Sequence, residues 1–174
     1  PGKIARRFTG GLNLLENATL HAVGSRSETR AREFASQYGY KRSYGSYEEL
    51  VEDPELDVVY VASPHSHHKE HTLLCLNAGK SVICEKAFAI NSSEVREMIE
   101  TARASNLFLM EALWPPFQPS YKRTHEELAT GRFGEVMTVR SVFSFKPPYE
   151  PEKRLYNTDL GGGVLLDIGI YPVI

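Results

Sequence analysis

A continuous run of mainly β-branched residues, Asp57-Val-Val-Tyr-Val-Ala62, constrains the fold of this chain more than any other segment. Strands that are covered by helices on both faces have such runs, whereas half-exposed strands alternate apolar and polar residues. Strand-like and helix-like stretches alternate along the chain: further strands over 19–23, 82–84 and 107–111, and helices over 4–15, 30–38, 47–51, 69–77 and 91–105. This alternation is typical of βαβ units and predicts an α/β fold with a parallel sheet.

The alternation breaks at Trp114-Pro115-Pro116, which we interpret as a domain boundary. The elements predicted beyond it are a helix over 120–129, a turn over 131–134, a long strand over 136–145 and a final helix after the glycines 161–163. We therefore predict one domain over 1–114 and the beginning of a second over 115–174.

Composition excludes several classes of protein. Lys and Arg number 20 and Asp and Glu number 22, so the net charge is 20 − 22 = −2, and no basic stripe indicates nucleic-acid binding. No apolar run is long enough to span a bilayer, and no signal-peptide pattern is present. Cys75 and Cys84 lie in apolar runs and are interpreted as buried thiols of a reducing compartment, which predicts a cytoplasmic protein.

Both ends of the chain look trimmed. It begins at Pro1-Gly2 without an initiator methionine, and it stops at Val173-Ile174 inside an apolar stretch. We expect a segment of a longer protein, with a mass well below that of its source.

Lys86 is the first candidate for catalysis, because it follows an apolar strand at the edge of the sheet where open α/β folds bind ligands. Asp167 and Tyr171 are spaced i,i+4 and would share one face of a helix. A free phenol has a pKa of about 10, so a tyrosine acts as a base at neutral pH only where a nearby cation such as an ammonium stabilises the phenolate. The alternative is that Lys86 is an ordinary surface lysine and that Tyr171 only packs in a helix. The sequence spacing alone favours this alternative.

Two segments are candidates for cofactor binding. Gly2-Lys3-Ile4 matches the end of a glycine-rich turn, although a single glycine there carries little weight. Ser25-Arg26 follows a predicted strand, and no Asp or Glu occupies 24–27. In a dinucleotide-binding fold an arginine at this place accommodates a 2′-phosphate, whereas a carboxylate would bind the ribose of NAD. An equally supported interpretation is that Ser25 and Arg26 lie in a solvent-exposed loop and bind no cofactor.

Two other clusters have simpler interpretations. His65, His67, His68 and His71 suggest zinc, but no cysteine accompanies them, and we expect no metal. Trp114 to Phe117 would wall a substrate pocket or, as aromatic residues do more often, serve in packing.

Five segments together resemble the Gfo/Idh/MocA oxidoreductases, within them the branch of dihydrodiol dehydrogenases and NADP-dependent D-xylose dehydrogenases. The segments are Pro1-Gly-Lys-Ile-Ala-Arg6, similar to the second half of the branch's glycine loop; Val61-Ala-Ser-Pro-His-Ser-His-His68, similar to its P-x-x-x-H strand end; Gly79-Lys-Ser-Val-Ile-Cys-Glu-Lys86, similar to its E-K-P strand end; Phe108-Leu-Met-Glu-Ala-Leu-Trp114, similar to its next strand; and Leu160 to Pro172, similar to the helix carrying the family's Asp and Tyr.

The resemblance implies a Rossmann-type doubly wound parallel sheet whose first strand is missing, followed by the start of an α+β domain with a mainly antiparallel sheet. It implies an NADP-dependent dehydrogenase, with NADP preferred to NAD, that acts on a CH–OH group of a sugar or of a cyclic or aromatic diol and forms a homo-oligomer when intact. The alternative is a non-catalytic NAD(P)-binding regulator of the same fold.

The resemblance also assigns residues. Lys86 and Tyr171 are expected to transfer the proton, Asp167 to orient them, and Trp114 and Phe117 to contact substrate. The residues expected around NADP are Gly2, Lys3, Ile4, Ser25, Arg26, Ser63, Pro64, His65, His68, Glu85 and Lys86. Ala87 stands where the family usually has proline, so we expect the strand itself to place the Lys86 amine. Without the first strand and most of the second sheet, this segment alone should lack a complete site.

Overall fold

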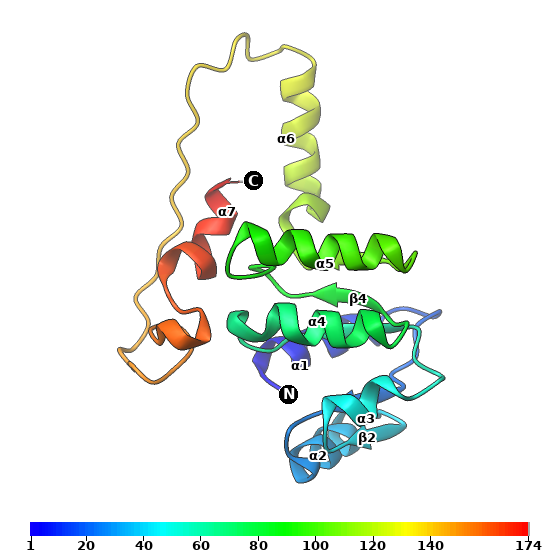
Figure 1. The fold of residues 1–174 in the computed structure, drawn as a ribbon. Coiled ribbons are helices and arrows are strands. Elements are labelled where there is room, and N and C mark those ends of the chain that lie inside the picture. Colours follow the sequence, from blue (N-terminus) through cyan, green and yellow to red (C-terminus); the bar gives the residue numbers. More distant parts are fainter. Residues whose placement is uncertain (174) are drawn as a thin grey trace.

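The computed structural model describes residues 1–173, and its centre is a parallel sheet of three strands, of which Figure 1 labels β4. These strands are β3 (Val58–Val61), β4 (Ser81–Cys84) and β5 (Leu109–Glu111), in the order β3-β4-β5. A separate pair of parallel strands consists of β1 (Ala22–Gly24) and β2 (Arg42–Tyr44). The parallel pairing and the alternating elements agree with the predicted α/β class.

Helices cover both faces of β3. Tyr60 stacks on Phe8 of α1 (Lys3–Leu12), with ring centroids 3.7 Å apart. Its neighbours Val59 and Val61 belong instead to the core that includes α4 (His68–Asn77). Successive residues of a strand point to opposite faces, so α1 and α4 lie on opposite sides of the sheet. This double covering explains the unbroken apolar run that singled out the segment in the sequence.

The core lies between β4 and two helices. The helices α4 and α5 (Ser92–Ala104) lie side by side over the sheet (Figure 1). Leu76 of α4, Val82 of β4 and Met98 of α5 are each at most 1% exposed. Both thiols, Cys75 and Cys84, are free and belong to the same cluster.

Three α-helices within residues 1–173 begin at a side-chain cap. The Ser27 hydroxyl accepts the Arg30 amide at the start of α2 (Glu28–Tyr38). Ser46 caps α3 (Tyr47–Val51), and Asn91 caps α5 in the same way. A cap accepts one of the amides that the first helical turn leaves unpaired, so these residues define where each helix begins.

The second half of the chain contains the predicted helix over 120–129 and the final helix, but it departs from the prediction at one strand. The elements there are η2 (Pro115–Phe117), α6 (Pro119–Ala129), η3 (Thr158–Leu160), the π-helical η4 (Leu165–Gly169) and α7 (Ile170–Val173). The strand predicted over 136–145 is wrong, because this segment is extended but has no sheet pairing. Val139 and Val142 are 80% and 81% exposed. Alternating residues form a strand only where a neighbouring strand accepts their hydrogen bonds, and none lies beside this segment within residues 1–173.

The prediction also missed β2, whose sequence Arg42-Ser-Tyr44 is short and polar. The helix predicted over 4–15 ends at Leu12. The division of the chain at residue 114 stays a prediction.

Candidate active site

Backbone pairing places Lys86 at the carboxyl edge of the sheet. The Glu85 amide donates to the Val61 carbonyl at 2.9 Å, so the chain is still held against β3 one residue before Lys86. On the other side, the Ala112 amide donates to the Cys84 carbonyl at 2.7 Å. The Lys86 side chain is 14% exposed and projects from this fixed edge.

A glycine turn from the second half of the chain docks on the same edge. Nδ1 of the buried His65, in η1 (His65–His67), hydrogen-bonds the Gly161 carbonyl at 2.9 Å. Gly161 has φ +73°, and a Cβ there would lie 2.6 Å from the Ile90 side chain and 2.7 Å from that of His65. Only glycine fits this contact, which delivers η4 and its Asp167 to the sheet.

Lys86, Asp167 and Tyr171 are brought together by this docking. The Lys86 ammonium donates to the main-chain carbonyl of Asp167 and lies 3.4 Å from its Oδ1. It also lies over the Tyr171 ring, 5.0 Å from the ring centroid, where the negative face of the ring attracts a cation. The geometry therefore agrees with the expected constellation, while the role of each residue stays a prediction.

Aromatic residues surround Tyr171. Nε1 of Trp114 donates to the Tyr171 hydroxyl at 3.3 Å. The Phe143 ring lies edge-on to that of Tyr171, with centroids 5.2 Å apart. Phe117 is placed in η2 and is 61% exposed. Phe143 was not predicted as a site residue, because in sequence it is one apolar position of a presumed strand.

Asp167 binds a second cation, Arg154. Nη1 of Arg154 donates to Asp167 Oδ1 at 2.9 Å. Burial acts to raise the pKa of Asp167, but the Arg154 hydrogen bond and the charges of Lys86 and Arg154 outweigh it and hold the pKa below its ordinary value. Asp167 is thus ionised at neutral pH. Arg154 was also missed in the sequence, because a single arginine in a Pro-rich loop gives no spacing signal.

Glu85 is bound within the protein. The Tyr60 hydroxyl donates to Glu85 Oε1, and the Lys86 amide donates to Oε2 at 3.2 Å. Burial and then the neighbouring Glu85 carboxylate raise the pKa of Tyr60 well above its ordinary value, so the phenol stays a donor. This bond links α1, through Phe8 and Tyr60, to the residue before Lys86.

The residues expected around a dinucleotide fit an anionic group. The first turn of α1 has no side-chain cap and no acidic residue, unlike the capped helices, so the amides that follow Gly2 are available to an anion. At the end of β1, the buried Ser25 hydroxyl accepts the Ser27 amide at 3.3 Å, and Arg26 is exposed.

The four clustered histidines bind protein groups. The completely buried His68 places Nδ1 2.7 Å from the Ala87 carbonyl and Nε2 2.9 Å from the Ser63 carbonyl. His71 bonds the Ser63 hydroxyl at 2.9 Å, and His67 bonds Ser66. The imidazole of His65 likewise bonds Gly161, so the expected contacts of His65 and His68 with a cofactor stay predictions.

A grouping of potential metal ligands in residues 1–173 lies elsewhere, at His21, Asp53 and Glu55. The Arg42 guanidinium already binds both carboxylates of this grouping, Asp53 at 3.1 Å and Glu55 at 2.6 Å. The Arg42 guanidinium therefore neutralises the two carboxylates that a metal ion would otherwise bind.

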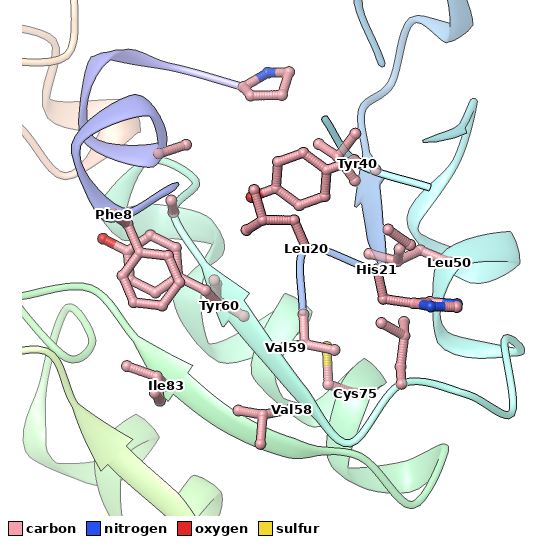
Figure 2. A pocket seen from close by; sticks show the side chains of 18 of the residues that line it. Phe8, Leu20, His21, Tyr40, Leu50, Val58, Val59, Tyr60, Cys75 and Ile83 are labelled. Carbon is pink, nitrogen blue, oxygen red and sulfur yellow. The ribbon is translucent and has the colours of Figure 1, made fainter. Parts of the chain in front are cut away.

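A cavity of about 630 Å³ lies apart from Lys86, Asp167 and Tyr171, none of which lines it. Figure 2 shows it between the two sheets, with His21 and Leu50 on one side and the stacked Phe8 and Tyr60 on the other. It is bordered by β1 and β3, whose edges facing it are unpaired in the described part of the chain. One more strand here would join the two sheets, in keeping with the expected missing first strand.

Parallel strands whose carboxyl ends meet an uncapped helix N-terminus, with a lysine, an aspartate and a tyrosine at the same edge, are typical of a dinucleotide-binding fold. Comparisons with known proteins agree. Residues 1–113 match the model of the Gfo/Idh/MocA oxidoreductase family with its NAD-binding Rossmann fold, and residues 121–173 match the Gfo/Idh/MocA C-terminal domain. The chain belongs to the Gfo/Idh/MocA family, so the expected family and fold are confirmed.

Curated relatives include the trans-1,2-dihydrobenzene-1,2-diol dehydrogenases of Mus musculus and Danio rerio, which are 43% and 46% identical over 174 residues. In each comparison the alignment covers 99% of this chain and 52% of the relative, so the chain spans about half the length of these proteins.

Among solved structures, the 3-ketoreductase KijD10 from Actinomadura kijaniata, in complex with NADP and TDP-benzene, has a TM-score of 0.86 and 31% identity. The match covers 99% of this chain and 53% of KijD10. A probable dehydrogenase from Thermotoga maritima has a TM-score of 0.71 and 30% identity over 77% of this chain and 40% of its own. Within residues 1–173, no helix has the length and apolarity needed to cross a membrane.

Proposed function

We propose that the intact protein is an NADP-dependent oxidoreductase that transfers a hydride between nicotinamide and a carbinol carbon of a sugar or of a cyclic or aromatic diol. The observation that carries this proposal is the meeting of Lys86, Asp167 and Tyr171 at the carboxyl edge of the parallel sheet. The names of the curated relatives support a diol as substrate, and KijD10 supports NADP as cofactor.

The chain's own residues handle the proton. Tyr171 takes the proton of the substrate hydroxyl during oxidation, and the Lys86 ammonium over its ring stabilises the phenolate form that this requires. Asp167 holds the ammonium through its carbonyl and carboxylate. Positioned acid–base groups of this kind contribute about 10²–10⁴-fold in rate. When bound, the nicotinamide supplies the hydride acceptor.

The cofactor would be held along the carboxyl edge. The amides of Lys3 and Ile4 after Gly2 suit the pyrophosphate, and Ser25 with Arg26 suits a 2′-phosphate. Because no carboxylate occupies 24–27, we expect NADP rather than NAD. Further contacts would come from Ser63, Pro64, His65, His68, Glu85 and Lys86.

Aromatic side chains favour a cyclic or aromatic diol. Trp114 is 54% exposed and Phe143 50% exposed beside Tyr171, so both present apolar ring surface next to the expected proton acceptor. Flat apolar rings pack well against such faces. Phe117 would extend this wall.

Two further proposals concern the whole protein. The free, buried thiols Cys75 and Cys84 support a cytoplasmic location, since reducing compartments keep thiols unpaired. We also expect the intact protein to form a homo-oligomer, which its mass in solution would reveal.

The test is reduction of NADP⁺ and of NAD⁺ by the intact protein, followed at 340 nm across sugars, trans-dihydrodiols and simple alcohols. Turnover of a diol or a sugar with a higher kcat/KM for NADP⁺ is the expected result. Tight NADPH binding without turnover of any substrate would favour the non-catalytic regulator instead.

A further inference from the structure

Arg154 is held on a turn that is fixed to the glycine run before the candidate site. The Gly162 amide donates to the Asn157 carbonyl and the Gly163 amide to the Leu155 carbonyl, at 2.9 Å and 3.0 Å. A Cβ on Gly162 would lie 2.8 Å from the Arg154 carbonyl, so the two segments pack backbone against backbone. The guanidinium therefore reaches Asp167 from an anchored base.

The two cations near Asp167 bind it differently. Arg154 Nη1 lies 2.9 Å from Oδ1, within the range of a full charge-assisted hydrogen bond, whereas Lys86 Nζ lies 3.4 Å from the same oxygen. The main hydrogen bond of the Lys86 ammonium goes to the neutral main-chain carbonyl instead. Arg154 is thus the principal partner of this carboxylate.

The other carboxylates near Lys86 have their own donors. Glu85 accepts the Tyr60 hydroxyl, and Glu111 of β5 accepts the Phe88 amide at 2.9 Å. Every acidic group that faces Lys86 from a neighbouring element is therefore engaged by another residue. The ammonium keeps only the longer contact of 3.4 Å with Asp167 Oδ1, and it lies over the Tyr171 ring.

We propose that Arg154 is a positioning residue, which holds the Asp167 carboxylate so that the Lys86 ammonium remains directed at Tyr171. Without Arg154, the Asp167 carboxylate loses its full charge-assisted hydrogen bond, so it no longer has a fixed position beside Lys86. The effect of Arg154 on turnover rests on the proposed function, whereas the effect of Arg154 on the Asp167 carboxylate does not.

The test compares Arg154→Gln with Arg154→Lys and with Arg32→Gln. Arg32 forms an exposed ion pair with Glu28 on α2, so its replacement controls for the loss of a surface guanidinium. The first measurement is the pH titration of the Asp167 carboxyl carbon by NMR. In Arg154→Gln, the guanidinium no longer opposes the effect of burial on Asp167, so the midpoint of the Asp167 titration moves to higher pH. In Arg154→Lys, a cation remains, so the midpoint stays close to that of the wild type.

The second measurement is the pH profile of kcat in the intact protein. Arg154→Gln is expected to lower kcat by about ten- to a hundredfold, as small misplacements of catalytic groups do, with KM for NADP⁺ nearly unchanged and with the pH midpoint of kcat displaced. Added guanidinium or Arg154→Lys should restore part of the rate.

An Arg154→Gln variant with the Asp167 midpoint of wild type would overturn the proposal, as would one that matches Arg32→Gln in kcat and pH profile. If the wild-type protein turns over no substrate, the proposed function fails, and the Asp167 titration alone decides the role of Arg154.

Discussion

Replacing Leu76 by alanine tests whether the core lies between α4, α5 and β4. The Leu76 side chain is 1% exposed and packs in the cluster with Val82 and Met98. Truncation removes most of its buried apolar surface and leaves a cavity that the surrounding strand and helix can fill only partly. Leucine-to-alanine changes at such positions cost about 2–5 kcal/mol.

The matched control is Leu14→Ala, because Leu14 is 84% exposed and follows the end of α1. The same chemical change there should alter the free energy of unfolding by less than about 0.5 kcal/mol. For a chain of 174 residues, 1 kcal/mol lowers Tm by about 2–4 °C, so a cost of about 3 kcal/mol for Leu76→Ala predicts a loss of about 6–12 °C.

Urea denaturation followed by circular dichroism measures the difference. Leu76→Ala should lower the midpoint while leaving the slope m unchanged, which identifies a change in stability rather than in the denatured state. Equal midpoints for the two variants would refute the assignment of the core to this cluster.

Three further outcomes follow from burial and capping. Burial is the largest cause that lowers the pKa of His68 and of His71 in the folded protein. The unfolded state therefore binds more protons, and the protein has its full free energy of unfolding above pH about 6.5. As the pH drops below that value, the free energy of unfolding falls by up to about 1.4 kcal/mol per pH unit for each histidine. Chemical denaturation between pH 7.5 and 5 checks this, and a flat profile would contradict it. Burial raises the pKa of Cys75 and Cys84 to about 12, so iodoacetamide should leave both unmodified in the native protein and label both in urea; rapid native labelling would show that the thiols are accessible. Asn91→Ala removes the cap of α5 and should cost about 1 kcal/mol, whereas the neighbouring exposed Ser92→Ala should cost little, and equal losses in urea melts would argue against the cap.

Local sequence signals predicted the Rossmann-like part of the chain well. The β-branched run at 57–62 specifies a strand through residues that are adjacent in sequence, and α2 and α5 likewise form within single short stretches of the chain. The strand expected at 136–145 failed for the opposite reason, because a strand depends on a partner and Val139 has none beside it in the described part of the chain.

The residues of the candidate site also differ in whether a local sequence signal marks them. Lys86 could be singled out by its place at a strand end, and Asp167 and Tyr171 by their i,i+4 spacing, but only the family resemblance favoured a shared role over simple packing. Arg154 and Phe143 join the site through loops whose path is set by the docking of Gly161 on His65. A contact between residues 96 positions apart has no local sequence pattern, so these two residues could be recognised only from the fold.

The most direct test of the account is hydride transfer by the Lys86→Ala variant of the intact protein, with NADPH binding measured in parallel by fluorescence. Lys69→Ala is the matched control, because Lys69 forms an ion pair with Glu97 on the outer surface of α4 and α5. We predict that Lys86→Ala loses about 10²–10⁴-fold in kcat while still binding NADPH, and that Lys69→Ala keeps its activity. Wild-type turnover by Lys86→Ala would contradict the assignment of proton transfer to the lysine, aspartate and tyrosine at the edge of the sheet.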